Sequence, residues 1–160
     1  MSVYKNDKLA DFMEAVRSIY QQTVKPSDIV LVVDGPISEE LKEAITILQG
    51  EIAVLNVIWL STNQGHAIAR QTGLLAAKNE LVAVMDADDI SVPNRFEKQL
   101  KTFEQYPDVT VVGGLIHEFI GDTKNIVGKR IVPEYDVDIK AYMKSRCPMN
   151  LVTVMMRKSH

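Results

Sequence analysis

Three carboxylates occupy four consecutive positions of this sequence, directly after an apolar run. Residues 81–85 read LVAVM, and Asp86, Asp88 and Asp89 follow at once as an Asp-x-Asp (DxD) motif. Two unit negative charges about 4 Å apart repel by roughly 4 kcal/mol at the effective dielectric of a protein. Adjacent carboxylates at a strand end are oxygen ligands for Mg²⁺ or Mn²⁺, which also take water and substrate phosphates. We therefore expect a metal-assisted site that binds a diphosphate and whose cation offsets this repulsion.

The same acids have other interpretations. An Asp-rich turn between a strand and a helix is a common structural feature, and for the DADD motif alone this alternative stays open. An EF-hand loop is excluded because Ile90 and Ser91 stand where that loop needs a ligand and a glycine. A phosphatase-type nucleophilic aspartate normally follows the first strand and precedes Gly-Thr, and this sequence has neither feature at DADD.

Two further polar features are expected at the same edge of the fold. The apolar run 28–33 ends at Asp34, and the NQG sequence at 63–65 separates the apolar run 54–60 from an Ala-rich helix. Ligands of α/β sheets bind beyond the carboxyl ends of the strands, so these features and DADD predict one shared site. Asp34 has an alternative interpretation as a turn residue before Gly35.

Alternating apolar runs and amphipathic segments predict the elements that carry this site. Strands are predicted at 28–33, 54–60, 81–85, 109–114, 115–120, near 126–131 and at 151–157. Helices are predicted at 8–22, 37–48, 65–78, 93–106 and 136–146. Near-continuous Val, Ile and Leu runs are typical of strands covered on both faces, and alternation of strands with helices predicts parallel βαβ units. The expected fold class is α/β, a three-layer sandwich around a mostly parallel central sheet.

Length and composition predict a single domain over residues 1–160 and disfavour several function classes. The net charge is −3 at pH 7 without a Lys/Arg block, which disfavours a nucleic-acid partner. The longest apolar stretch, IAVLNVIWL, is shorter than the roughly 20 residues that span a bilayer. The single cysteine, Cys147, fits a reducing compartment. We expect a cytoplasmic protein without a transmembrane segment; peripheral attachment to the inner face of the membrane stays open.

Four segments together resemble the bacterial family-2 glycosyltransferases, which have the GT-A fold. They are KPSDIVLVVDGPISEEL, the NQG turn, ELVAVMDADDISVPNRFEKQL and RCPMNLVTVMMRKS, in the family's order and spacing over essentially the whole chain. The resemblance implies inverting transfer of a sugar from a nucleotide-sugar donor, usually a UDP-sugar. It also implies Mn²⁺ or Mg²⁺ bridging the diphosphate, and a saccharide or lipid-linked acceptor in polysaccharide biosynthesis.

The resemblance also implies roles for individual residues. Asp34 matches the acid that hydrogen-bonds the uracil ring, and Ser2 lies at the end of a first strand that lines the nucleotide pocket. Asp86 matches a residue near the ribose. Asp88 matches the principal metal ligand, with Asp89 beside it.

Other polar residues carry alternative interpretations. Arg70 matches a basic family position that often approaches the nucleotide, and a solvated helix face is an equal alternative. His66 is expected to be a polar surface residue in the first turn of the same helix. His117 and Glu118 are expected to be strand-face residues, and Asn150 is a candidate for the acceptor side of the cleft.

The chain departs from the family pattern at three places. Val33 stands where the family commonly has a first acid, and Leu151 and Val152 replace a His-Pro pair. The family's general base lies in a Glu-Asp motif downstream of RKS, and the sequence stops before such a motif. We therefore expect a domain that is incomplete at both ends, with its general base beyond residue 160. A base contributes typically 10²–10⁴-fold in rate, so the alternative function is a non-catalytic nucleotide-sugar binding module. A nucleotidyltransferase ranks last, because MSVYKND lacks a glycine-rich, basic signature.

Overall fold

A computed structural model describes residues 1–159 of the protein. The strands are β1 (Ser2–Val3), β2 (Ile29–Val33), β3 (Leu55–Trp59), β4 (Leu81–Ala83), β5 (Val111–Val112), β6 (Ile116–Phe119), β7 (Ile126–Arg130) and β8 (Met155–Arg157). The helices are α1 (Leu9–Tyr20), α2 (Glu39–Glu51), α3 (His66–Ala76), α4 (Arg95–Gln105) and α5 (Asp136–Tyr142), with a 3₁₀ turn at Leu151–Thr153.

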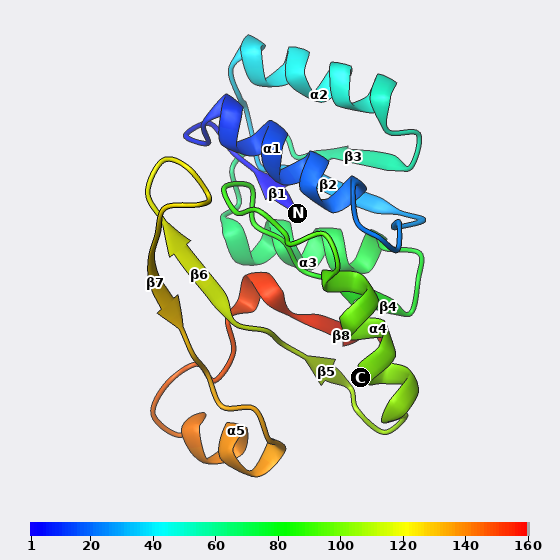
Figure 1. Cartoon of the computed structure of the whole chain (residues 1–160). Coiled ribbons are helices and arrows are strands. Elements are labelled where there is room, and N and C mark those ends of the chain that lie inside the picture. Colours follow the sequence, from blue (N-terminus) through cyan, green and yellow to red (C-terminus); the bar gives the residue numbers. More distant parts are fainter. Residues whose placement is uncertain (160) are drawn as a thin grey trace.

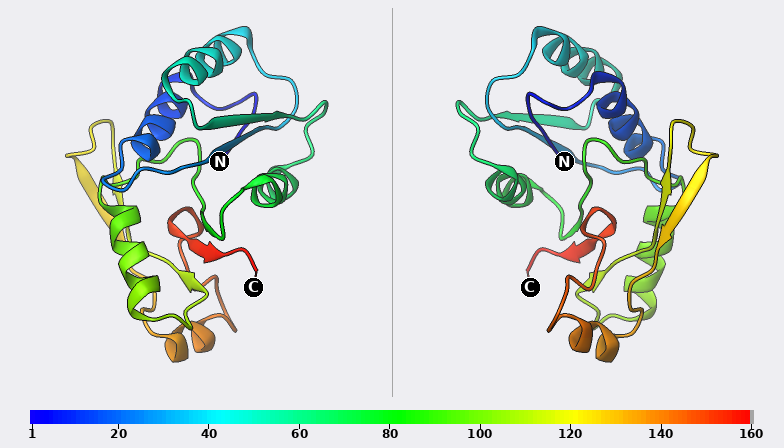
Figure 2. Two further views of the ribbon diagram at one scale, coloured as in Figure 1. Left: turned by 90° about the vertical axis from the view of Figure 1, so that its right-hand side faces the viewer. Right: turned by 90° about the vertical axis from the view of Figure 1, so that its left-hand side faces the viewer.

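The strands are arranged in three groups (Figure 1). β1, β2 and β3 form a parallel sheet with β2 at its centre. β4, β8 and β5 form a second sheet in which β8 lies between the other two and is antiparallel to both. β6 and β7 form an antiparallel hairpin that lies with α5 at the periphery of the molecule (Figure 2). The protein is therefore an α/β fold with a parallel sheet, as expected.

The last predicted strand differs from the expectation in two ways. Residues 151–157 divide into the 3₁₀ turn and β8, because the N–H groups of Thr153 and Val154 donate to the carbonyls of Asn150 and Leu151. β8 then enters the sheet antiparallel to its neighbours. Because β4 and β5 both run antiparallel to β8, they are parallel to each other, so β4, α4 and β5 form a βαβ unit with one strand inserted.

The core of the parallel sheet follows the alternation of side chains along β2. Leu31 and Val33 are completely buried in the cluster formed with α1 and α2, and Val32 faces α3, where it lies against Gly73. Both faces of β2 are thus covered, which explains its continuous apolar sequence. Ser38 caps α2 by accepting the N–H of Leu41 at 3.3 Å.

A buried glutamine fixes the segment that follows DADD. The side-chain amide of Gln22, two residues after α1, donates to the carbonyl of Val92 at 2.8 Å and to Ser91 Oγ at 3.2 Å. Its carbonyl oxygen accepts the N–H of Phe96 at 3.1 Å. These contacts join α1 to the start of α4 and so position the chain between them. Among the described residues, none of the helices is both long and apolar enough to cross a membrane.

Candidate functional site

The predicted acids converge at the carboxyl edge of the strands. Asp34 follows β2 directly, and Asp86 follows β4 after two residues. Ser2 lies in β1, opposite Val32 of β2. The NQG turn leads from β3 into α3 on the same side of the sheet (Figure 1). The shared edge that the sequence predicted is therefore present.

The Asp34 carboxylate organises the NQG turn. Asp34 is only 4% exposed, and its two oxygens accept the backbone N–H groups of Gln64 at 2.7 Å and Gly65 at 3.0 Å. The side-chain amide of Asn63 donates in return to the carbonyl of Asp34 at 3.0 Å. Asp34 is thus a turn-stabilising residue in this structure, and this role leaves carboxylate lone pairs that can accept a further donor.

Two glycines allow this close approach. Gly35 has a φ of 85°, and a Cβ there would lie 2.4 Å from the backbone nitrogen of Asn63. Gly65 has a φ of 88° at the position that caps α3. Such angles are readily adopted by glycine alone, so the turn can bring the start of α3 against Asp34.

Arg70 neutralises Asp86 across the two sheets. Its guanidinium donates to Asp86 Oδ1 at 2.5 Å, and the two side chains are 28% and 29% exposed. His66, one helical turn earlier, lies 3.9 Å from the same oxygen. The interpretation of Arg70 as a solvated helix residue is therefore wrong, because the guanidinium points inward to an ion pair. The positive charge of Arg70 also offsets part of the repulsion among the carboxylates of DADD.

The remaining acids of the motif are not neutralised in this way. Asp88 is exposed and Asp89 is half-buried. Burial raises the pKa of Asp89, and the charges of Asp88 and Asp86 raise it further, while Arg130 of β7 opposes them. The local potential at this edge is therefore negative and favours a cation.

Asp7, which the sequence analysis did not place at the site, belongs to the same electrostatic cluster. Burial raises the pKa of Asp7, as do the charges of Asp88 and Asp86, whereas the N–H of Tyr4 and the charge of His66 lower it. Asp7 Oδ2 accepts that N–H at 2.9 Å. The sequence shows only that Asp7 is a carboxylate in the loop after β1. Its place beside the DADD acids becomes clear only once the positions of β1 and β4 are known.

The chemistry of these acids fits a divalent cation that is shared with a substrate. Among residues 1–159, no three or more His, Cys, Asp or Glu side chains are grouped so that they could hold a metal by themselves. Mg²⁺ and Mn²⁺ need only one or two protein carboxylates when phosphate oxygens and water complete the shell. Asp88 and Asp89 can provide this partial set of ligands.

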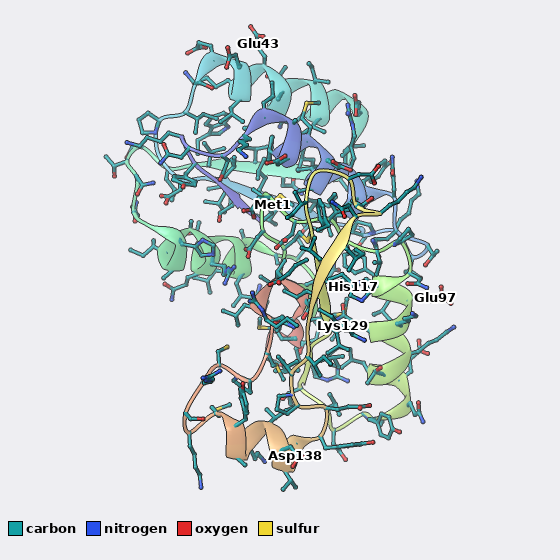
Figure 3. All side chains as sticks on the ribbon, turned by 60° about the vertical axis from the view of Figure 1, so that its left-hand side comes forward. Met1, Glu43, Glu97, His117, Lys129 and Asp138 are labelled. Atoms are coloured by element: carbon teal, nitrogen blue, oxygen red, sulfur yellow. The ribbon has the colours of Figure 1, made fainter. Side chains whose placement is uncertain are left out.

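A cavity of about 230 Å³ adjoins Asp88. Asp11 and Glu14 of α1 line one side, and the turn of the β6–β7 hairpin, residues 121–123, lines another. The hairpin therefore forms a wall beside the acids, and its exposed strands carry His117 opposite Lys129 (Figure 3).

The other candidates have structural partners. His117 and Glu118 lie on exposed positions of β6, as expected, and Glu118 pairs with Arg130 at 2.7 Å. Asn150 is buried, and its side-chain amide donates to the carbonyl of Gly114 at 3.0 Å. Its amide nitrogen therefore holds the loop that precedes β8, which gives Asn150 a structural role whether or not an acceptor binds nearby.

Comparison with known proteins identifies one family. The family model described as "Glycosyl transferase family 2" matches residues 2–158. The chain is 36% identical over 159 residues to an uncharacterized glycosyltransferase of Haemophilus influenzae, covering 99% of this chain and 59% of the relative. It is 35% identical to the amylovoran biosynthesis glycosyltransferase AmsE of Erwinia amylovora, over 99% of this chain and 58% of that protein. It is 32% identical to the UDP-Gal:alpha-D-GlcNAc-diphosphoundecaprenol beta-1,3-galactosyltransferase of Escherichia coli, over 99% of this chain and 57% of that protein. The chain thus spans about three-fifths of the length of these relatives.

Solved structures with the same fold include two nucleotide complexes. Residues 1–349 of S. aureus TarS in complex with UDP align with a TM-score of 0.70 and 16% identity, over 99% of this chain and 46% of that chain. The mannosyltransferase PcManGT from Pyrobaculum calidifontis, in complex with GDP-Man and Mn²⁺, aligns with a TM-score of 0.62 and 20% identity. The alignment covers 73% of this chain and 34% of that chain. At this identity the likeness establishes the fold.

Proposed function

Because this chain belongs to glycosyl transferase family 2, we propose that it carries the donor site of an enzyme that moves a sugar from a nucleoside diphosphate to an acceptor. The observation that carries this proposal is the cluster of Asp34, Arg70 and the DADD acids at one edge of the strands. It combines acceptors for a nucleobase, a cation for phosphate and carboxylates for a metal. The donor is proposed to be a UDP-sugar.

Each residue of the cluster has a proposed task in binding the donor. Asp34, held by the NQG turn, has spare lone pairs to accept an N–H of the uracil ring. Ser2 lines the nucleotide pocket from β1. Asp86 approaches the ribose, and Arg70 either keeps Asp86 in place or turns toward the diphosphate. The E. coli relative, whose name specifies UDP-Gal, and the TarS complex with UDP support this choice of nucleotide.

Asp88 and Asp89 would hold Mn²⁺ or Mg²⁺ together with the diphosphate. Such an ion, when bound, stabilises the negative charge that develops on the departing diphosphate. The complex of PcManGT with Mn²⁺ supports a divalent metal in this fold. The two carboxylates supply oxygen ligands of the type these ions prefer, and their exposure leaves the remaining coordination positions open to phosphate.

The acceptor is proposed to be a saccharide or a lipid-linked saccharide in polysaccharide biosynthesis. The names of AmsE and of the E. coli relative, with its diphosphoundecaprenol acceptor, support this class. Its hydroxyl would attack the sugar from the side opposite the diphosphate, which inverts the anomeric centre. The proposed location is the cytoplasm or the inner face of the membrane, where nucleotide-sugars and lipid acceptors meet. We assign no general base among residues 1–159.

A second candidate function is a nucleotide-sugar binding module without catalysis. Val33 favours it, because a completely buried valine occupies a position where the resemblance implies an acid. The two functions share the donor site and differ in turnover. Once donor binding has been measured, an assay of donor hydrolysis and of sugar transfer to a saccharide acceptor distinguishes the two functions. Turnover supports the enzyme, and binding without turnover supports the binding module.

The test is calorimetric titration of UDP with and without Mn²⁺ on the wild-type chain and on Asp88→Asn. We expect metal-dependent binding that the substitution abolishes. Asp108→Asn is the matched control, since it makes the same charge change at an exposed residue before β5, at the opposite edge of the sheet. Equal UDP binding with and without metal in all three proteins would overturn the assignment of Asp88.

A further inference from the structure

Residues 115–147, which contain the β6–β7 hairpin and α5, form an arm in which no residue is buried. The hydrophobic core of the described residues lies entirely in other parts of the chain. A two-stranded hairpin and a short isolated helix are each marginally stable in water. α5 has seven residues and no side-chain cap. The elements of the arm are thus of a kind that packing against another surface normally stabilises.

The arm exposes a concentration of apolar side chains. Of the twenty large apolar side chains that are exposed among residues 1–159, nine belong to the arm, which is about a fifth of the chain. Five of these are at least 61% exposed: Ile120, Ile131, Tyr135, Val137 and Met143. Single exposed apolar residues are normal in soluble proteins, but a concentration of this kind marks an interaction surface.

Cations are interleaved with these apolar side chains. The arm has six Lys or Arg and five Asp or Glu, a net charge of +1, whereas the whole chain has −3. Two of the six cations are held in ion pairs by Glu118 and Asp136. The other four are exposed and have no ion-pair partner in the part of the chain that the structure describes: Lys124, Lys129, Lys144 and Arg146. The arm is therefore a basic and apolar surface on an acidic protein.

This combination fits an anionic lipid surface better than a second copy of the chain. Two copies of the arm would bring the same unpaired cations together, and like charges repel. A bilayer surface offers lipid phosphates to the cations and an interfacial region to tyrosine rings and aliphatic side chains. Tyr135 and Tyr142 lie at the two ends of α5, and Lys144 and Arg146 follow shortly after it. The aromatic and basic residues of α5 thus lie close together, as an interfacial segment requires.

The arm also leads to the candidate donor site. The turn of the hairpin, residues 121–123, lines the cavity beside Asp88. α5 lies at the other end of the arm (Figure 1). A surface that holds α5 and the strands of the hairpin is therefore connected with the acids through the hairpin itself.

We propose that the arm docks the protein on an anionic lipid surface. Its aliphatic and tyrosine side chains enter the headgroup region, and its four unpaired cations contact lipid phosphates. A lipid-linked acceptor held in that surface then reaches the cavity beside Asp88 along the hairpin. Only this last step rests on the proposed function, because the docking surface is defined by the residues of the arm.

The test is flotation of the wild-type chain with two kinds of vesicle. One kind contains phosphatidylglycerol and phosphatidylethanolamine in equal parts, and the other contains phosphatidylcholine alone. We expect binding to the anionic vesicles to be tighter by about tenfold or more, because several cations contribute to it. Added salt should weaken this binding, since it screens exposed charges.

Single substitutions separate the two contributions. Lys144→Gln should weaken binding to the anionic vesicles about fivefold, which is the contribution of one cation near the surface. Ile131→Ser should weaken it about tenfold, because an aliphatic side chain no longer leaves water. The matched controls Lys42→Gln and Ile47→Ser make the same changes in α2, at the far end of the molecule from α5 (Figure 1), and should leave binding unchanged. None of these four side chains is buried, so the melting temperature should change little.

Three results would overturn the proposal. The first is equal binding to the two kinds of vesicle, or no binding to either. The second is an equal loss of binding in Ile131→Ser and Ile47→Ser, because the arm would then have no special part. The third is a dimer that forms with rising protein concentration and that Ile131→Ser abolishes, which would assign the arm to a second copy.

Titration of UDP with Mn²⁺ on the same proteins keeps the docking surface separate from the donor site. The arm variants Lys144→Gln and Ile131→Ser should bind UDP as the wild type does. Failure of the wild type to bind UDP would overturn the proposed function, whereas the vesicle measurement reports on the arm alone.

Discussion

Replacement of Asp34 by Asn tests whether this residue holds the NQG turn. In the structure, each carboxylate oxygen accepts one backbone N–H, from Gln64 at 2.7 Å and from Gly65 at 3.0 Å. Asn keeps the shape and one acceptor, but its NH₂ group faces the second N–H, which then has no partner. The variant therefore loses one charge-assisted hydrogen bond, weakens the other and leaves a partly buried N–H without its protein partner.

The expected loss of stability is about 1.5–3 kcal/mol, since a hydrogen bond to a charged group contributes about that much. For a chain of this length, such a loss lowers the melting temperature by roughly 5–10 °C. The loss arises in the absence of any ligand, because the turn is part of the unliganded fold. The bond from Asn63 to the carbonyl of Asp34 should survive, so the variant should still fold.

The assay is urea denaturation followed by circular dichroism, with UDP affinity measured on the same preparations. Asp108→Asn serves as the control for a change of one charge at an exposed position. A loss below about 0.5 kcal/mol would refute the structural role, because it is the size of an ordinary surface effect. If UDP binding alone disappeared while stability stayed unchanged, Asp34 would act only as a nucleotide ligand.

Three other predictions concern groups around the site. Arg70→Met should destabilise the fold by about 1–2 kcal/mol, because it leaves the half-buried Asp86 unpaired. Urea denaturation measures this loss, and an unchanged denaturation midpoint would contradict a stabilising ion pair. Arg95 is half-buried and donates to the carbonyls of Val84 at 2.9 Å and Val154 at 3.2 Å, and burial lowers its pKa to about 10. Arg95→Met should cost about 2–4 kcal/mol because both carbonyls lose a charged donor, and thermal melts that match wild type would exclude this role. The Met1 amino group, with its pKa lowered from 8.0 to about 6, stays neutral in the folded state where the unfolded state binds a proton. Stability should therefore rise between pH 6 and pH 8 by up to about 3 kcal/mol. Acetylation of the amino group should remove this increase in urea titrations at the two pH values, and an identical increase in the acetylated protein would assign it to other groups.

The sequence predicted the elements of this fold because their information is local. The apolar run 28–33 and the amphipathic helix after Ser38 contain their own periodicity and cap, and β2 and α2 appear where these signals lie. The position of DADD at the end of a strand is equally local, and it predicted that Asp86, Asp88 and Asp89 would lie near Asp34. The family match over residues 2–158 agrees with the segments that carry the resemblance.

Pairings between distant parts of the chain depended on the tertiary structure. The contact of Arg70 with Asp86 spans 16 residues and that of Asp34 with the NQG turn about 30, so periodicity within one element contains no information about either. The same holds for β8, whose apolar sequence suits a strand of either direction and whose place between β4 and β5 depends on the path of the chain before it. Residue types determined which side chains could bind a metal or a phosphate. Only the packing of the strands and α3 decided which of them are neutralised by a neighbour and which stay open to a ligand.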